Sequence, residues 1–447
     1  MAIIRLGHFD PDPTIESSVP KFVEAVYKNL KKTEPEGKLR DDNFSALRTV
    51  IPFENFRSFD EFAGVNIQSI AHIQDALRDA GFLSGELEKG FYGYRTRSAM
   101  RLFQEYIRTY EDIPLAECWP DGIYGSKSHK QLLRWKSAKK KANWLVTDSG
   151  ETGLVARWEE ARSQNSTAPL EGTEFLNWLN YLNEIKDHYQ STPNTMIKKV
   201  NDFNGATDTI KVANWDFGID HIHLIGIRRD PERGKGRGSD DVFLLLIKGM
   251  VFKFQGSTDP GKSENEDGAP FIVQGQHNYQ FGWHQQAYMA LRPQDPGVLV
   301  VRSKDFKLRE SNVLNGFDST PNKTINIHWG GRGGQDKVIE DKFPWSAGCQ
   351  VITGTGYLDH RNLPVDCSEY RAALPDEPFT SKTTRGAYNV LSDLVTALSG
   401  GMADSSNAND KRDMTVKYML LNEEDLARSA FASGTLQNAI GFRSKMK

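Results

Sequence analysis

The sequence predicts an α+β protein in which helices fill the N-terminal part and strands dominate the C-terminal part. Up to about residue 200, apolar residues recur at intervals of three and four, which is typical of amphipathic helices. After Asn201 they form short runs of Val, Ile, Leu and Phe bounded by Gly, Pro and Asp, which favours strands and turns. With 447 residues, the chain is long enough for roughly two or three domains.

Composition excludes several classes of protein. The 56 Lys and Arg balance 59 Asp and Glu, so no excess of positive charge indicates a nucleic-acid partner. Three cysteines are too few for a disulfide framework, although one pair stays open, and no CxxC pair suggests a zinc ribbon. The most apolar stretch, 242–254, contains two lysines and is shorter than the roughly 20 residues of a membrane-spanning helix. We therefore expect no nucleic-acid partner and no transmembrane segment.

The N-terminal residues 1–64 show no regular period, and we expect an irregular lead-in there. Asp10 and two prolines interrupt the first residues before the apolar core of a secretory signal can form, so no Sec signal peptide is predicted. Over 70–80 the apolar spacing predicts a helix that ends at Gly81, a residue suited to the C-cap. A second apolar stripe predicts a helix over 99–110.

A turn and the start of a helix occur twice in the sequence. The segment GFYGYRTRSAMRLF at 90–103 aligns with GIYGSKSHKQLLRW at 122–135. The paired glycines stand where a tight turn needs a positive φ, and we expect the hydroxyls of Thr96 and Ser128 to help cap the two helices. The repeat predicts two similar turn–helix units.

The run from Ile70 to Trp135 resembles the small helical peptidoglycan-binding domain. It carries that family's Ile-Gln helix, its Gly-x-Tyr-Gly turn, a Thr and a Phe-Gln pair. The resemblance implies a wall-binding module at 65–140 with peptidoglycan as its partner. The alternative is a helical bundle without a ligand.

Residues 141–200 are predicted to form a helical connector, because aromatic and aliphatic residues recur at helical spacing between Trp158 and Ile185. The β-rich domain is predicted at 201–447, with a hairpin turn at Lys248-Gly249. Its predicted strands lie within 209–215, 221–229, 242–257, 297–303, 324–329 and 414–421, and a last helix lies within 422–431. Polar segments expected to be loops or insertions are 228–241, 260–270, 374–384 and 399–413.

One segment, 324–354, combines residue types that carry chemistry. His328 ends a predicted strand, and Cys349 begins the next one, directly after Ser346-Ala-Gly348. A thiol is a useful nucleophile only as the thiolate, so a nearby imidazole is the usual activator. Gly348 removes bulk beside the sulfur and lets the N–H groups of Gly348 and Cys349 point toward an oxyanion. The pattern predicts a dyad of Cys349 and His328 on adjacent strands.

This segment resembles the catalytic motif of L,D-transpeptidases, a His followed, after a Gly-containing loop, by Ser/Thr-His-Gly-Cys. The upstream run VFLLLIKGMVFKFQGSTDPG also resembles that family's paired strands, Lys-Gly turn and Ser-Thr-Gly loop. The resemblance implies an L,D-transpeptidase-like domain that needs no cofactor. In it Cys349 is the nucleophile, His328 is the base, and Ser346 and Gly348 are motif residues.

The chain departs from that pattern at three points. Ala347 stands at the usual His, Gln350-Val351 stands where an Arg often follows, and the gap between His and Cys is long. The missing His leaves transfer and hydrolysis both open. His277 or His284 is a candidate for a replacement imidazole from another loop, the alternative being that both are ordinary surface or core histidines.

Three residues flank the motif and are candidates for the substrate groove. Trp329 and Trp345 offer apolar walls, and the guanidinium of Arg332 suits a stem-peptide carboxylate. The two other cysteines, Cys118 and Cys367, lack a comparable setting and are expected to be structural.

A rival site is His221-Ile-His223, because strand alternation puts both imidazoles on one face, as a zinc site requires. No third ligand and no general-base carboxylate at a recognisable spacing accompanies them. We therefore expect no metal in the site.

The sequence thus predicts a helical peptidoglycan-binding-like module, a helical connector and a β-rich L,D-transpeptidase-like domain. The expected activity is acyl transfer or hydrolysis by a cysteine enzyme at L,D linkages of stem peptides, at the cell wall or in the periplasm. Without a Sec signal, phage lysis or specialised secretion is the expected delivery, as for a lysin or toxin. The alternative is a non-catalytic cell-wall-binding or assembly protein with a degenerate catalytic fold.

Overall fold

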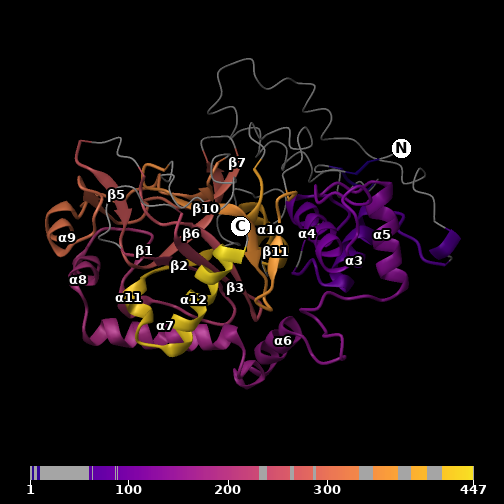
Figure 1. The fold of residues 1–447 in the computed structure, drawn as a ribbon, viewed down its shortest axis with the longest axis horizontal. Coiled ribbons are helices and arrows are strands. Elements are labelled where there is room, and N and C mark those ends of the chain that lie inside the picture. Colours follow the sequence, from indigo (N-terminus) through magenta and orange to yellow (C-terminus); the bar gives the residue numbers. More distant parts are fainter. Residues whose placement is uncertain are drawn as a thin grey trace, which may run out of the picture.

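The computed structural model is a mixed α/β protein whose C-terminal region is rich in sheet (Figure 1). It describes residues 3–4, 8–10, 60–62, 64–85, 87, 89–230, 239–261, 266–284, 288–331, 346–370, 384–399 and 415–445. Most of the predicted lead-in 1–64, and the central parts of the four segments expected to be loops, lie outside the described residues.

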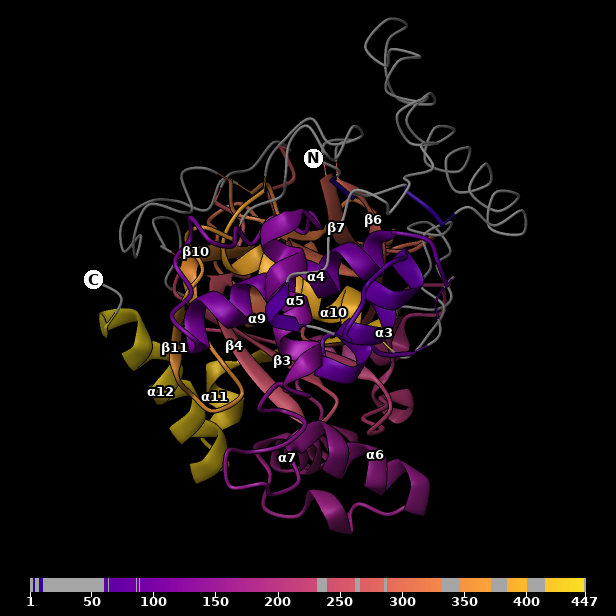
Figure 2. The ribbon, with the colours of Figure 1, turned by 90° about the vertical axis from the view of Figure 1, so that its right-hand side faces the viewer.

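The N-terminal helices are α3 (Ile70–Ala80), α4 (Tyr94–Tyr110) and α5 (Ser126–Ser137), with a 3-10 turn, η3 (Asp60–Phe62), before them, and these three helices are called the helical module below. Ser69 caps α3 by accepting a hydrogen bond from the N–H of His72, and Gly81 ends it with a φ of 94°. The predicted first helix and its glycine C-cap are confirmed. Figure 1 shows the three helices gathered at one side of the sheet, and Figure 2 shows the molecule from that side.

Two glutamines hold the internal repeat in place. Gln74 Nε2 donates to the carbonyl of Phe91 and to Thr96 Oγ1, while its Oε1 accepts from the N–H of Gly90. Gln104 makes the same three bonds to the second turn, to Ile123, Ser128 and Gly122. Gly90 and Gly122 have φ values of 84° and 76°, as the repeat predicts.

The expected capping role of Thr96 and Ser128 is wrong. The N-caps are Gly93 and Gly125, which make no side-chain cap bond. The two hydroxyls stand at the third helical residue and donate back to the carbonyls of the preceding turn. They are therefore partners of the two glutamines, and they fix the turn rather than the helix end.

The connector contains α6 (Leu154–Gln164), η4 (Ala168–Leu170), α7 (Glu174–Ser191) and α8 (Thr195–Asp202). In Figure 1, α7 runs beneath the sheet together with α11 (Glu423–Leu426) and α12 (Ala430–Lys445). Trp178 of α7 and Leu436 of α12 share an apolar cluster with Ile225 and Leu244 of the sheet. These helices therefore cover one face of the sheet with an apolar layer.

Within the described residues, eight strands of the main sheet close into a ring. The hydrogen-bonded order is β6-β12-β2-β3-β4-β10-β9-β7, and β7 pairs again with β6. The bounds are β2 (Ile222–Arg228), β3 (Asp241–Ile247), β4 (Met250–Ser257), β6 (Gly275–His284), β7 (Tyr288–Pro293), β9 (Ile327–Trp329), β10 (Gln350–Leu358) and β12 (Val416–Asn422). Short strands β1 (Thr209–Ile210) and β11 (Pro364–Asp366) extend β6 and β10, and η5 (Val212–Asn214) follows β1.

The predicted hairpin at Lys248-Gly249 is confirmed as the turn between β3 and β4. Both residues have positive φ, 48° and 79°, which is the backbone of a type I′ turn. At the other end of the domain, β5 (Ala269–Ile272) pairs with β8 (Val300–Ser303), and α9 (Glu310–Gly316) follows. Phe271 and Val301 pack there against Met196 of α8.

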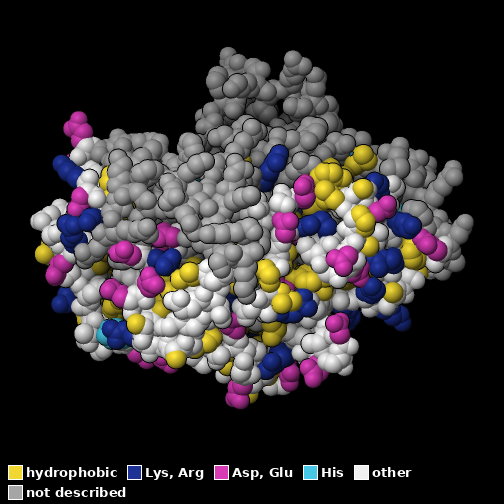
Figure 3. Space-filling view, viewed as in Figure 1, with side chains coloured by type: hydrophobic (Ala, Val, Ile, Leu, Met, Phe, Trp, Pro, Cys, Tyr) yellow, Lys and Arg dark blue, Asp and Glu magenta, His cyan; other side chains and the backbone are white. Residues whose placement is uncertain are grey.

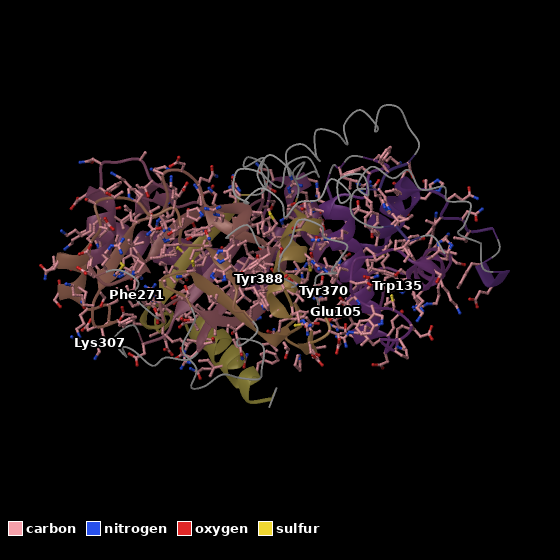
Figure 4. The ribbon with its side chains drawn as sticks, turned by 90° about the horizontal axis from the view of Figure 1, so that it is seen from above. Glu105, Trp135, Phe271, Lys307, Tyr370 and Tyr388 are labelled. Atoms are coloured by element: carbon pink, nitrogen blue, oxygen red, sulfur yellow. The ribbon has the colours of Figure 1, made fainter. Side chains whose placement is uncertain are left out.

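Helix α10 (Ala387–Leu398), which is not among the helices predicted from the sequence, packs between α4 and the sheet. Arg101 of α4 makes two hydrogen bonds to Asp393 of α10, and Tyr370 donates a third to the same carboxylate. Figure 4 shows Tyr370 beside Glu105 of α4, between the helical module and the sheet. One apolar cluster continues from the module through α10 into the sheet, so the module is joined to the domain by core packing.

The surface agrees with the balanced composition. On the face that Figure 3 shows, acidic and basic side chains are interspersed among the described residues, without a patch of one sign. None of the helices in the described part of the chain is both long and apolar enough to cross a membrane.

Candidate functional site

Strands β9 and β10 run parallel, with His328 on β9 and Cys349 directly before β10. Val351 is the register partner of His328, and the N–H of Gln350 donates to the carbonyl of Asn326 at 2.8 Å. Ile327 and Ile352 point into the main core, so strand alternation turns His328 and Val351 to the opposite face. Cys349 lies directly before β10, two residues before Val351.

The thiol of Cys349 is half-buried and lies at the first residue before β10. Its Sγ accepts the N–H of Asn326 at 3.3 Å and donates to the carbonyl of Thr324 at 3.4 Å. An N–H aimed at sulfur stabilises the thiolate more than the thiol. The segment before β9 therefore holds the sulfur in place and supplies one donor to its charged form.

Gly348 has a backbone conformation that only glycine adopts readily here. Its φ is 133°, and a Cβ would lie 2.7 Å from Pro270 Cγ and 2.9 Å from Ile325 Cδ1. Its N–H donates to Ser346 Oγ at 3.1 Å, and Ser346 is buried. One of the two N–H groups expected to meet an oxyanion is thus bonded to the motif serine in this structure.

The imidazole of His328 has its Nδ1 2.7 Å from the carbonyl oxygen of Trp329. A carbonyl only accepts, so Nδ1 carries the proton and the lone pair of the neutral ring is on Nε2. The Tyr288 hydroxyl lies 3.2 Å from Nδ1 and donates to the same carbonyl at 3.5 Å. This is the orientation that a general base needs, because one nitrogen is fixed and the other carries the lone pair that takes a proton.

A second imidazole, that of His284 at the end of β6, stacks on His328. The ring centroids are 4.2 Å apart and the planes differ by 29°. Asn326 Nδ2 donates to His284 Nδ1 at 2.9 Å. Asn326 thus contacts the thiol through its backbone and the imidazole of His284 through its side chain.

The pKa of Tyr288 is raised, mainly by burial and to a smaller extent by the thiolate of Cys349. Tyr288 therefore stays a phenol at neutral pH. The same cysteine acts on Arg292 of β7, where it opposes the lowering of the guanidinium pKa by burial. Both residues belong to β7, the strand beside β9. The charge of the Cys349 thiolate therefore affects side chains of β7 as well as the groups near β9.

His277, the other candidate for a replacement imidazole, is not brought to the site. It is fully buried on β6, seven residues before His284, with Nδ1 3.0 Å from Thr209 Oγ1 and Nε2 3.0 Å from the carbonyl of Val273. Burial lowers its pKa to about 3, so it stays neutral. Its two nitrogens serve the packing of β6 and β1, so the expectation for His277 is wrong while that for His284 fits the geometry.

Trp329 does not line a groove with its indole. The ring is buried on the core face, and it is the backbone carbonyl of Trp329 that meets His328. The flanking candidates Arg332 and Trp345 lie outside the described residues.

The rival imidazoles of His221 and His223 have other partners. His221 pairs with Asp216 at 2.7 Å, and His223 Nε2 donates to the carbonyl of Gly218 at 2.9 Å. Burial lowers the pKa of His223 to about 4. Within the described part of the chain, no group of three or more His, Cys, Asp or Glu is placed to hold a metal ion.

The other two cysteines differ from Cys349 in environment. None of the three is in a disulfide, so the open alternative of a bridged pair is wrong. Burial raises the pKa of Cys118 to about 12 and raises that of Cys367 well above its usual value. Both thiols stay protonated and inaccessible.

Two residues of the site were not singled out from the sequence. Asn326 has a detectable signal, because it lies two residues before His328 on a predicted strand and therefore shares its face. Tyr288 has none, since its approach to His328 depends on the pairing of β7 with β9. Comparisons with protein-family models, with curated proteins and with solved structures give no match to this chain.

Proposed function

We propose that the chain is a peptidoglycan-active cysteine enzyme that transfers or hydrolyses acyl groups at L,D linkages of stem peptides. The observation that carries the proposal is the arrangement on β9 and β10. A half-buried thiol directly precedes the strand that pairs with β9, and β9 carries an imidazole whose Nδ1 is fixed by a carbonyl, so that Nε2 carries the lone pair. The substrate class comes from the resemblance of the two motifs to peptidoglycan-binding and L,D-transpeptidase families.

The proposed reaction has two steps. His328 Nε2 takes the proton of the thiol, and Cys349 Sγ attacks the peptide carbonyl to form a tetrahedral oxyanion. The C–N bond then breaks as the imidazolium protonates the leaving amine, and a thioester remains on Cys349. Water or a second amine attacks the thioester and regenerates the thiol, which gives hydrolysis or transfer respectively.

The helical module is proposed to hold the enzyme on the cell wall. Because α10 joins the module to the sheet through shared core packing, the module would present the thiol site to the polymer in a fixed orientation. Binding to the wall raises the local concentration of substrate without changing the chemistry. This role also predicts action at the cell wall or in the periplasm.

Intact-mass analysis of the full chain tests the chemistry. After incubation with a disaccharide tetrapeptide and an acid quench, we expect a covalent adduct on the wild type and none on Cys349→Ala. His328→Asn should slow adduct formation by roughly 10²–10⁴-fold. Cys349→Ala should still sediment with purified sacculi, because the module is intact in that variant. An adduct that persists in Cys349→Ala, or none on the wild type, contradicts the assignment.

The second candidate is a non-catalytic wall-binding or assembly protein. It is favoured by the bond from the N–H of Gly348 to Ser346 Oγ, which occupies one oxyanion donor, and by Ala347 at the usual His. Mass spectrometry of sacculi digested after exposure to the protein separates the two. New cross-links or shortened stems require an enzyme, whereas sacculus binding with unchanged muropeptides supports the scaffold.

A further inference from the structure

A cavity of about 550 Å³ lies where the helical module, the connector and the sheet meet. Its walls come from the end of α3 and the turn after it, from segment 141–162, from the start of β2 and from the β3–β4 hairpin, with Leu398 of α10 completing it. None of the residues of the thiol site lines it. The cavity is therefore a separate place in the molecule, and what it binds does not depend on the chemistry of Cys349.

Lys248 is the buried cation on the wall of this cavity, and it forms no ion pair with the described residues. The residue is 8% exposed, and its ammonium makes no hydrogen bond or ion pair with any residue that the structure describes. Its contact is the ring of Trp158, whose centroid lies 4.7 Å from Nζ. Lysines are almost never this buried unless paired, because an isolated ammonium pays a large desolvation cost.

The charged groups around Lys248 stabilise its ammonium only in part. Burial is the main cause that lowers its pKa to about 8, the carboxylate of Glu159 opposes it from a distance, and Arg162 adds to it. Arg162 itself pairs with Asp220 and also lies 4.7 Å from the centre of the Trp158 ring. Glu159 therefore stabilises Lys248 only in part, and no carboxylate on the cavity wall contacts it.

The turn does not explain why a lysine stands here. The first position of a type I′ turn favours Asn, Asp or Gly, which tolerate positive φ, and Lys248 has a φ of 48°. A side chain with this backbone cost and this desolvation cost is unfavourable for the hairpin alone. Both costs are offset if its ammonium binds something that enters the cavity.

The side chains of the cavity wall restrict the chemical class of ligand that fits. The wall carries charges of both signs, because Asp79, Glu159 and Asp220 stand beside Arg78, Lys141 and Arg162, and a ligand with one carboxylate for Lys248 and one positive group suits such a wall. Asp79 and Glu159 are suited to a positive group on the same ligand. Aliphatic side chains make up much of the remaining wall: Leu83, Leu145, Val155, Ile222, Ile247 and Leu398. A volume of this size is that of an ordinary small-ligand site.

We propose that this cavity binds a zwitterionic ligand of the size of a short peptide, with its carboxylate on Lys248 Nζ and its apolar part against the aliphatic wall. Because the ligand would contact the module, the connector and the sheet together, its binding stabilises their packing.

A titration followed at Lys248 itself tests the proposal on the full chain. Lysines are reductively methylated with ¹³C, which keeps the positive charge, and the Lys248 resonance is assigned by its loss in Lys248→Asn. Trialanine should shift that resonance in a saturable way, and its C-terminal amide should bind at least about tenfold more weakly. An equal response to acid and amide, an equally strong response to sodium acetate, or no response to trialanine overturns the proposal.

Calorimetry on the unmodified protein adds matched variants. Lys248→Asn removes the charge and suits the turn, Lys248→Arg keeps the charge, and Lys198→Asn alters an exposed lysine of α8. We expect the affinity for trialanine to fall at least about tenfold in Lys248→Asn and to stay within about threefold in the other two. Equal affinities in Lys248→Asn and the wild type contradict the role of Lys248, and if Lys248→Asn does not fold, the comparison of acid with amide decides.

Discussion

His284 lies on His328 with ring centroids 4.2 Å apart, although the two residues belong to β6 and β9, which are not neighbours in the sheet. The strand between them, β7, carries Tyr288, whose hydroxyl lies 3.2 Å from His328 Nδ1. Asn326, which also contacts the thiol, donates a hydrogen bond to His284. In the proposed enzyme, His284 would take the place of the motif imidazole that is missing at Ala347, as a ring that positions His328.

Replacement of His284 tests this positioning role. His284→Ala removes the ring on which His328 stacks, and we expect kcat for muropeptide conversion to fall by about 10–100-fold with KM little changed. His284→Phe keeps a flat ring and should recover most of that loss. The thermal midpoint of each variant shows whether the fold is kept. If Phe and Ala lose activity equally, stacking does not position His328.

The glycine before the thiol gives a second test. In Gly348→Ala the new Cβ meets Pro270 and Ile325 within 3 Å, so the backbone has to shift and carry Cys349 with it. We expect the rate of Cys349 alkylation by iodoacetamide to change severalfold and stability to fall by about 1–3 kcal/mol. Gly354→Ala is the matched control, because its φ is 88° but no atom lies within 4 Å of the new Cβ. Equal alkylation rates in the wild type and Gly348→Ala contradict this account.

Local pattern was enough to predict much of the fold. The helix over 70–80, its glycine C-cap, the Lys248-Gly249 hairpin and the strand that carries His328 each follow from short-range spacing, and each is confirmed. The same reasoning misassigned Thr96 and Ser128, because a hydroxyl near a helix start suits a cap as well as a glutamine from the preceding helix. Only the tertiary position of Gln74 and Gln104 decides between them.

The site was predictable only where sequence neighbours share a strand face. The strand of His328 and the strand that follows Cys349 are neighbours because β9 and β10 pair in parallel, which the length of chain between them allows but does not require. The choice between His277 and His284 could not be made from the sequence. They lie seven residues apart on one strand, so about 23 Å of extended chain separates the buried core from the site.

The buried histidine of β6 makes stability depend on pH. His277 has a folded pKa of about 3 against 6.5 for a free imidazole, so below pH 6.5 the unfolded chain binds a proton that the folded chain does not. The free energy of unfolding should therefore fall by about 1.4 kcal/mol per pH unit from this residue between pH 6.5 and 3.

Denaturant titrations of the wild type and His277→Gln at pH 7, 5.5 and 4.5 check that slope. The variant should be less stable at pH 7, since hydrogen bonds to Thr209 and Val273 are weakened, and the gap should narrow as the pH falls. His223, whose pKa is also lowered, is present in both proteins, so its contribution to the pH dependence of stability cancels in the comparison. A gap that is constant with pH would show that His277 is not neutral in the fold.

The last prediction concerns the ion pair that joins the module to the sheet domain. Arg101 and Asp393 are 3% and 1% exposed, with Nε–Oδ2 and Nη2–Oδ1 distances of 2.5 and 2.8 Å. Removing one partner leaves a buried charge, so Asp393→Ala should lower the free energy of unfolding by about 3–5 kcal/mol. The double variant Arg101→Met, Asp393→Leu should cost less than the single one, because no charge is left unpaired. The exposed pair Arg309–Asp305 is the control, and Asp305→Ala should cost at most about 1 kcal/mol.

If the Arg101–Asp393 pair couples the helical module to the sheet domain, calorimetry should show one transition for the wild type and two for Asp393→Ala. An independent transition of the module already in the wild type would refute the shared core.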